Sequence, residues 1–477
     1  MKAMEPMIVG LTGLLFLVVA GWALRSFRTS RCFWLNPLVL PISVWTASYP
    51  VWAMVRSTVY PEGSISGLGG IHLETRLLVV LFATLFIALL GVSLRIFVPA
   101  YARRLEPMAA MHVSRRESVL IHLVFVVVAG AWLVRFWSGS VFGLYEEFEQ
   151  LIHSLWENMV GTLAGVVWFA LPASLLAYWV SRKWIFLLEA LLLIGVLLAY
   201  AVVSTSKGAL LQVIVCLLVV SSAFGHRYVR SVKGNVVLMI TAIVGLILFG
   251  AYSYEIRDKA YYAVRRLAPY DVREIAERVG VLPAGEVIGK NLFRVVDRLI
   301  GYGDGLARLV EGSADRSNPV YALGSLVEIG NLVPRFVWGG RPHLSFNHHV
   351  TSAVWGMYGL LSETPIGRIG EAFYVAGWFG VSYGLLYGAL FGLVGMAWTR
   401  LRRSVWGAAC WVAVFLVWVL PDAYLTYNLK QLVVVIGTWR LGLLVIGSCG
   451  DLVGQRPKRA ARLHQRRVLP LASQGGL

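Results

Sequence analysis

Arg368 and Glu371 stand three residues apart at the start of a long apolar run, in the stretch SETPIGRIGEAFYVAGWFG. A guanidinium binds phosphate oxygens through two parallel hydrogen bonds, and a fixed carboxylate accepts the proton of an attacking hydroxyl. Tyr374 follows Glu371 by three residues, so we expect it to share a helix face with Glu371 and to orient it. The stretch therefore suits transfer of a group from a phosphate ester. The alternative is that Glu371 only caps its helix, in the first turn, where the helix dipole favours a carboxylate.

Three arginines in residues 317–370 are candidates for binding an anion, namely Arg335, Arg341 and Arg368. The segment is poor in charge and rich in aromatic residues and glycine, so its arginines are not explained by solubility. His348 and His349 lie in the same segment and compete with Glu371 for the role of base. Tandem histidines in a polar loop are also common as surface residues. Neighbours in an extended segment point in opposite directions, so only one of the two histidines can face a site.

Lys207 and Arg135 extend this set of candidate anion ligands. Lys207 follows three hydroxyl residues, 204–206, and begins an apolar run. A lysine at a helix start is unfavourable with the helix dipole, so either it binds an anion or its chain reaches to water. Arg135, near the end of another apolar run, has the same two alternatives. Glu189 lies inside an apolar run, where a carboxylate is costly, and the sequence indicates no role for it.

The composition is that of a membrane protein, since apolar residues make up 58% of the chain and charged residues 14%. Runs of about 18 or more apolar residues cross a bilayer core of roughly 30 Å, and they must be helical because lipid offers the backbone no hydrogen-bond partner. We predict an all-α polytopic membrane protein with about 11 transmembrane helices. They are expected near residues 7–25, 36–56, 77–98, 118–137, 158–180, 184–203, 207–225, 235–252, 371–398, 404–421 and 431–449.

One connection, residues 253–370, is far longer than the others. Its content of apolar and aromatic residues argues against disorder, and residues 291–312 show the 3–4 spacing of an amphipathic helix. Asp304 and Asp315 are expected to stabilise the fold or lie on the surface. The chain is thus divided into a transmembrane bundle (1–252), a large external loop (253–370), further transmembrane spans (371–450) and a basic cytoplasmic tail (451–477).

The net charge of +18 is distributed over alternate loops between the predicted spans. Short loops rich in Lys and Arg stay in the cytoplasm, so the charge predicts topology: N-terminus outside, C-terminus inside. Nucleic-acid binding is not expected. The four cysteines lie in or near spans or on the cytoplasmic side, and motifs typical of metal sites are missing. We therefore expect neither metal nor cofactor. Glycines at 380, 384, 388 and 392 are expected to line one face of a helix and let a neighbour approach closely.

Four stretches resemble the Wzy-type oligosaccharide repeat-unit polymerases, the O-antigen and exopolysaccharide polymerase family. They are TSKGALL, FRVVDRLIGYGDGLA, LVPRFVWGGRP and TPIGRIGEAFYVAGWFGVSYGLLYGALFG, and the similarity covers roughly residues 200–398. Two departures stand out. The chain has Arg341 before Pro342 where the family often has lysine, and it has Val375 and Ala376 where the family often has an asparagine.

The resemblance implies a GT-C-like membrane glycosyltransferase in the bacterial inner membrane, with its large loop in the periplasm. Its substrate would be a polyprenyl-diphosphate-linked oligosaccharide, and a chain-length regulator protein would be a possible kind of partner. Lys207, Arg335, Arg341 and Arg368 would contact diphosphate and sugar, and Glu371 would act as base or position the acceptor. Two other functions stay open: a glycan ligase that uses the same donor, and a transporter. A transporter is expected to show internal repeats and charges near the bilayer midplane.

Overall fold

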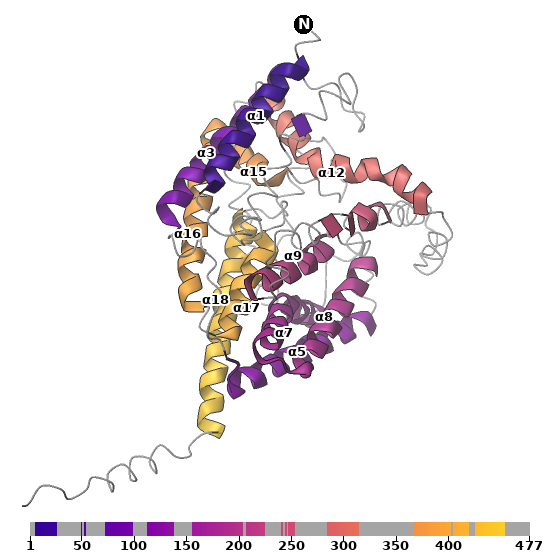
Figure 1. Cartoon of the computed structure of the whole chain (residues 1–477), viewed down its shortest axis with the longest axis vertical. Coiled ribbons are helices and arrows are strands. Elements are labelled where there is room, and N and C mark those ends of the chain that lie inside the picture. The colour runs from indigo at the N-terminus through magenta and orange to yellow at the C-terminus, as the bar shows by residue number, and fades with distance from the viewer. Residues whose placement is uncertain are drawn as a thin grey trace, which may run out of the picture.

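The computed structural model is almost entirely helical, and its described residues contain no strand (Figure 1). The structure describes residues 5–25, 49, 52–53, 72–98, 112–137, 155–203, 207–224, 240–241, 244–245, 247–252, 284–313, 366–401, 404–418 and 425–453. The predicted all-α class is therefore confirmed for this part of the chain.

Five stretches of the described residues are helical, long and apolar enough to cross a membrane. They are Leu73–Phe97 (α3), Arg115–Trp137 (α5), Met159–Ser181 (most of α6, Leu155–Gly165, with α7, Val167–Ser181), Trp184–Ala201 (within α8, Trp184–Val203) and Gly367–Ala397. Shorter apolar stretches lie in α1 (Glu5–Leu24), α9 (Lys207–Phe224), α17 (Val405–Trp418) and α18 (Leu425–Val453). Each overlaps a predicted span. The predicted span 36–56 falls largely outside the described residues and 235–252 is described only in part, so the number 11 stays a prediction.

Close packing of α3 against α16 (Tyr383–Leu401) depends on the predicted glycine face. A Cβ atom added to Gly384 would lie 2.4 Å from the carbonyl oxygen of Phe86, and one added to Gly388 would lie 2.3 Å from the Cβ of Ser93. Ser93 Oγ also donates a hydrogen bond to the carbonyl of Leu385, at 2.7 Å. The two backbones therefore approach more closely than any side chain at these positions would permit.

The predicted span 371–398 is not one continuous helix. The chain forms α15 (Gly367–Ala376), a 3₁₀ segment, η5 (Gly377–Ser382), and then α16. Gly377 ends α15 with a φ of +55°, a left-handed conformation that favours glycine. Gly380 packs against the carbonyl of Ala372, so here the glycine face lets the segment fold onto its own preceding turn.

The start of α15 corrects a second prediction, that Glu371 lies in the first turn of its helix. The helix begins at Gly367, whose φ is +68° and whose position beside the Tyr302 ring leaves little room for a Cβ atom. The first turn contains no acidic residue, and Glu371 follows it. Glu371 is therefore not a helix cap, and Arg368 is the charged residue of the first turn.

The helices form two groups that meet where α16 contacts α17. One group contains α1, α3, α15, α16 and α12 (Ala284–Ser313); the other contains α5 to α9 with α17 and α18 (Figure 1). In the second group, α7 packs against both α8 and α17. The start of α5 is fixed by a capping box, in which Ser114 and Glu117 exchange backbone-to-side-chain hydrogen bonds. Glu117 Oε1 also accepts the Trp406 backbone N–H at 3.5 Å, which ties α5 to the start of α17.

The relative directions of the helices agree with the predicted alternation of spans. Arg95 donates to the Trp22 carbonyl at 3.1 Å, so α1 and α3 end together. In the same way His122 meets Glu189 near the starts of α5 and α8, while Arg135 lies over Tyr200 near their ends. The sequence requires these neighbours to be parallel, because one predicted membrane span lies between the two members of each pair.

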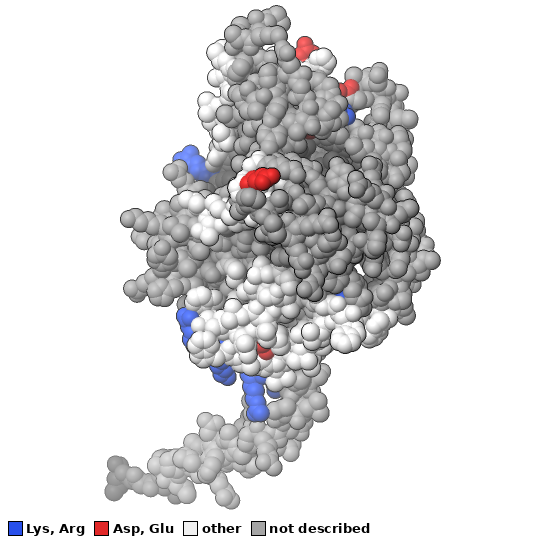
Figure 2. Space-filling view, turned by 90° about the vertical axis from the view of Figure 1, so that its right-hand side faces the viewer, with Lys and Arg blue, Asp and Glu red and all other residues white. Residues whose placement is uncertain are grey.

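Basic residues gather where α5 begins and where α7 joins α8. They are Arg115, Arg116, Arg182 and Lys183. Since α5, α7 and α8 pack together, these residues mark one end of the bundle, and Figure 2 shows a group of basic side chains toward the lower end of the described surface. This is the end predicted to face the cytoplasm.

Candidate functional site

Arg368, the arginine of the opening motif, is buried between three helices. Its side chain is 2% exposed. Nη2 donates a hydrogen bond to the carbonyl of Trp418, near the end of α17, at 3.0 Å. The guanidinium carbon also lies 5.7 Å from the centre of the Tyr387 ring on α16, within the range of a cation–π interaction. Arg368 thus joins α15, α16 and α17 at one point.

Glu371 lies in the same cluster and is equally buried, with 2% of its side chain exposed. The Tyr387 hydroxyl donates a hydrogen bond to Glu371 Oε2 at 3.4 Å. Tyr387 therefore interacts with both charged residues, through its ring face with Arg368 and through its hydroxyl with Glu371. We call Arg368, Glu371 and Tyr387 the α15 cluster.

Tyr387 is a partner of Glu371 that the sequence analysis did not identify. Tyr374 is buried on α15, 3% exposed, and the prediction that it orients Glu371 stays a prediction. Tyr387 was missed because it lies 16 residues from Glu371. In a continuous helix Tyr387 and Glu371 would lie several turns apart. The break at η5 redirects the chain, so that Tyr387 on α16 approaches Glu371 on α15. The one signal in the sequence is that Tyr387 lies between Gly384 and Gly388, the two glycines that bring α16 against α3.

Aromatic residues pack against one another on the helices that carry the α15 cluster and on their neighbours. The Phe82 ring of α3 meets Phe373 edge to face at 5.1 Å and Trp378 at 5.6 Å. On the other side Phe391 meets Trp418 at 4.8 Å. Opposite charges buried in such surroundings interact strongly, but their desolvation is expensive. Since both charged side chains are 2% exposed, the conformation described here supports a role beneath a substrate more than direct contact with it.

The amphipathic helix predicted over residues 291–312 is confirmed as α12, and it packs directly on the start of α15. Asp304 Oδ1 accepts a hydrogen bond from Trp52 Nε1 at 2.6 Å, and both side chains are buried. Gly303 packs against the Trp52 ring and Gly305 against Ile366, which immediately precedes α15. Asp304 thus stabilises the fold, as one of its two predicted roles requires.

The far end of α12 contacts α3. Glu311 accepts the backbone N–H of His72 at 3.3 Å, just before α3 begins. Partial burial lowers the pKa of Arg308 on α12, and the negative charges of Asp304 and Glu311 oppose this shift. The helix of the large loop is therefore anchored at both the start of α15 and the start of α3, and it covers the end of the bundle that contains the α15 cluster.

Arg135 lies in a different environment from Arg368. Its guanidinium carbon is 5.1 Å from the centre of the Trp132 ring and 5.8 Å from that of Tyr200. Trp132 is held in turn by a hydrogen bond from Nε1 to the carbonyl of Ala164, at 3.1 Å. These partners come from α5, α6 and α8, whereas those of Arg368 come from α16 and α17. Arg135 is partly exposed, and its role as an anion ligand stays a prediction.

Several predicted site residues lie outside the described residues. They are Arg335, Arg341, His348, His349 and the side chain of Lys207. The α9 backbone begins at Lys207, as predicted. Within the described residues, no group of three or more His, Cys, Asp or Glu side chains lies close enough together to hold a metal ion.

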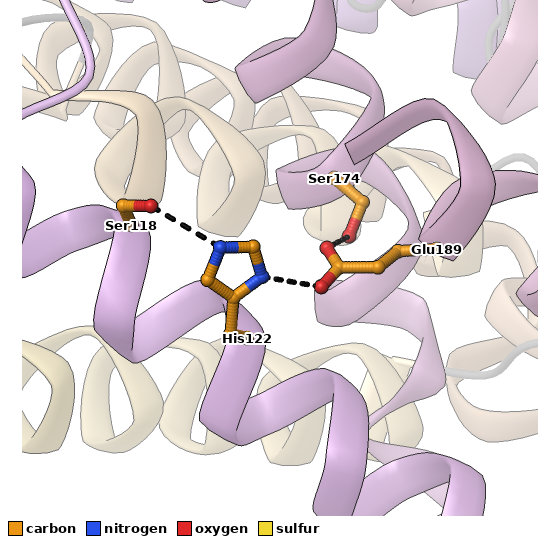
Figure 3. A network of polar contacts seen from close by, with 4 residues as sticks. All are labelled: Ser118, His122, Ser174 and Glu189. Atoms are coloured by element: carbon orange, nitrogen blue, oxygen red, sulfur yellow. Dashed lines mark hydrogen bonds and ion pairs between the residues drawn. The ribbon is translucent and has the colours of Figure 1, made fainter. Parts of the chain in front are cut away.

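A second polar cluster, which sequence reasoning did not assemble, joins α5, α7 and α8 (Figure 3). Glu189, the carboxylate without a predicted role, accepts from His122 Nδ1 through Oε1 and from Ser174 Oγ, at 3.3 Å, through Oε2. His122 Nε2 lies 3.3 Å from Ser118 Oγ. His122 was missed because its partner is 67 residues away. The signal available was one histidine within an otherwise apolar segment of α5.

The chain matches no protein-family model, no curated protein and no solved structure.

Proposed function

We propose that the protein is a membrane glycosyltransferase that polymerises polyprenyl-diphosphate-linked oligosaccharide repeat units at the outer face of a bacterial inner membrane. In this reaction the growing glycan leaves its lipid diphosphate and joins a hydroxyl of a new lipid-linked unit. Four motif stretches that resemble the Wzy-type polymerases support the proposal. Three of them overlap described helices: α9, α12, and α15 with η5 and α16.

The observation that carries the proposal is the α15 cluster itself. The arginine and glutamate of the motif are brought together with Tyr387, at the end of the bundle covered by the loop helix α12. A lipid-linked substrate presents its diphosphate and first sugar at such a membrane boundary. No charged group is expected to be buried in apolar surroundings without a role in structure or function.

The burial of the cluster refines the role of its members. Arg341 and Arg335, from the loop segment, are proposed to bind the diphosphate, together with Lys207. Arg368 supplies a fixed positive charge beneath the leaving group, where it stabilises negative charge that develops on the diphosphate. Glu371 is proposed to position the acceptor through Tyr387. Alternatively, it acts as the base after the residues that cover it move apart. His348 and His349 stay alternative bases.

The proposal is tested by polymer formation in cells that depend on this protein. Arg341→Ala and Glu371→Gln are expected to abolish polymer while the protein is still inserted in the membrane at normal levels. Glu286→Gln is a matched control, because Glu286 is an exposed carboxylate on α12. Polymer of normal length in both site variants would remove the basis for assigning the site here.

A transporter is the second candidate, and one observation favours it. The His122–Glu189 pair is an ionisable pair within membrane-spanning helices, as is common along transport pathways. Release of polyprenyl diphosphate by the purified protein would distinguish a polymerase from a transporter, because a transporter leaves the bond between lipid diphosphate and sugar intact. A glycan ligase would release it only when a different acceptor is supplied.

A further inference from the structure

The cluster of Ser118, His122, Ser174 and Glu189 takes no part in the proposed glycosyl transfer. It lies near the starts of α5 and α8, at the basic end of the bundle, whereas the α15 cluster lies at the end where α12 packs. The Glu189 side chain is 5% exposed and the His122 side chain 37% exposed. One member of the pair is therefore buried and the other is open to its surroundings.

The hydrogen bonds of the cluster determine where protons can be held. With Glu189 ionised, His122 donates its Nδ1–H to Oε1, and Ser174 donates to Oε2. Nε2 is then the atom of the imidazole that is left to accept a proton. It faces Ser118 Oγ, and a serine hydroxyl donates to a neutral Nε2 or accepts from a protonated one. Both protonation states of His122 are thus satisfied without a change of partner.

We propose that His122 and Glu189 form a proton-binding site that exchanges with the basic end of the bundle through the exposed edge of His122. Solvent supplies the proton, and it binds at Nε2. The charge of the pair changes from −1 to 0, because the imidazolium then neutralises the carboxylate. Phe186 stacks on the His122 ring, with 4.9 Å between ring centres and 5° between planes, and fixes the imidazole orientation in both states.

Other described charged groups on the surrounding elements are engaged elsewhere or lie at the helix ends. Glu117 bonds to Ser114 and to the Trp406 backbone. Arg182 lies over Tyr178 and Trp179, Arg440 over Trp439, and Arg135, at the other end of α5, over Trp132 and Tyr200. The remaining ones are Arg115 and Arg116 at the start of α5 and Lys183 between α7 and α8. These exposed cations lower the affinity for a proton only modestly, because solvent screens them, whereas Glu189 acts on His122 in direct contact.

The same contacts would also suit a purely structural link between α5 and α8, and the two roles differ in one property. A structural link keeps one protonation state over the range in which the protein is folded. A proton-binding site changes state, and its affinity depends on the carboxylate that stabilises the imidazolium. The test must therefore follow the protonation of His122 itself and not only the stability of the bundle.

The experiment uses the full chain in lipid nanodiscs, with ¹⁵N in the histidine side chains. The ¹⁵N signals are recorded over a pH series, and the signal lost in His122→Gln identifies His122. The expected result is a reversible titration of Nε2 while Nδ1 stays protonated. In Glu189→Gln the proton affinity of His122 falls by about tenfold to a thousandfold, because an opposite charge in contact is removed.

Two further variants keep the test decisive if Glu189→Gln does not fold. Ser174→Ala removes only the hydroxyl that donates to Oε2, and a rise of about two- to tenfold in the proton affinity of His122 is expected, because the negative charge of Glu189 is then stabilised by His122 alone. His112→Gln is the matched control, since His112 is an exposed histidine just before α5, and it should leave the titration unchanged. A single protonation state of His122 throughout the series would overturn the proposal. So would equal affinities in the wild type and in whichever carboxylate-site variant folds.

Discussion

The two ends of the bundle bury ionisable side chains in different ways. At the α15 end, Arg368 and Glu371 are each 2% exposed and interact with a residue that holds them in one arrangement, Tyr387. At the basic end, buried Glu189 is paired with His122, which is partly exposed. A guanidinium keeps its charge, whereas an imidazole can hold one ring proton or two. The chain thus holds two buried charges against Tyr387 at one end, and our proposal places an exchangeable proton at the other.

The packing of the two ends differs as well. The α15 cluster is held by helices in backbone contact, since glycines of α16 lie directly on α3. Around the His122 cluster the helices are joined by side chains, through the hydrogen bonds of His122 and Ser174 to Glu189. Backbone contact between helices suits the positioning of substrate charges at the α15 end.

The largest expected effect is that of Glu371→Ala. It leaves the buried Arg368 without this negative charge nearby and removes the acceptor of the Tyr387 hydroxyl. We expect the free energy of unfolding to fall by about 3–5 kcal/mol, as when one partner of a buried pair is removed. Unfolding by SDS in mixed micelles measures it. A loss no greater than that of Glu286→Ala, on exposed α12 surface, would show that the α15 cluster does not depend on the Glu371 charge.

Gly384→Ala probes the packing contrast. The new Cβ atom would lie 2.4 Å from the Phe86 carbonyl oxygen and 3.0 Å from the Leu90 nitrogen, so the backbones of α3 and α16 must separate. A loss of about 1–3 kcal/mol is expected from overpacking. Gly195→Ala is the control in the other group, with nothing within 4 Å. It should be neutral or stabilising by up to about 1 kcal/mol. Equal effects at both positions would contradict the contrast.

Trp52→Phe tests how α12 is held over the α15 cluster. It removes the donor that binds buried Asp304 at 2.6 Å. The expected cost is about 1–3 kcal/mol, confined to the docking of α12. Limited proteolysis within residues 284–313 should become faster while the transmembrane helices stay protected. Unchanged cleavage would mean that the glycine contacts of α12 are sufficient without this hydrogen bond.

The smallest effect is expected for Trp132→Phe in the second group. The substitution removes the hydrogen bond to the Ala164 carbonyl and keeps an aromatic ring beneath Arg135. A loss of about 0.5–1.5 kcal/mol follows from one hydrogen bond. Trp132→Leu should lose about 0.5–1 kcal/mol more if the cation–π contact contributes. The same loss in both variants would show that Arg135 gains nothing from the ring.

Much of the fold could be predicted from the sequence because it depends on local patterns. Apolar runs locate the helices, the 3–4 spacing within 291–312 predicts α12, and glycines every four residues predict the close helix face. The alternation of basic loops predicts which helices run in the same direction, and α1 with α3 and α5 with α8 agree.

The missed features depend on contacts between distant residues. Nothing local in the sequence shows that η5 returns Tyr387 to Glu371 or that Glu189 meets His122. The prediction of a continuous helix over 371–398 was wrong because nothing in the sequence distinguishes Gly377, whose φ is +55°, from a glycine inside a helix. Arg368 was expected at a membrane surface, but its exposure depends on how α17 and α12 close over it.

Transfer by the purified protein is the most direct test of glycosyl transfer at the α15 end. The protein in nanodiscs would receive one synthetic polyprenyl-diphosphate oligosaccharide, with products separated on a gel and free polyprenyl diphosphate measured. We predict a ladder with release of polyprenyl diphosphate in the wild type and in Trp132→Phe, and neither product in Glu371→Gln that is still folded. Absence of release from folded wild-type protein, or an equal ladder from Glu371→Gln, would contradict the account.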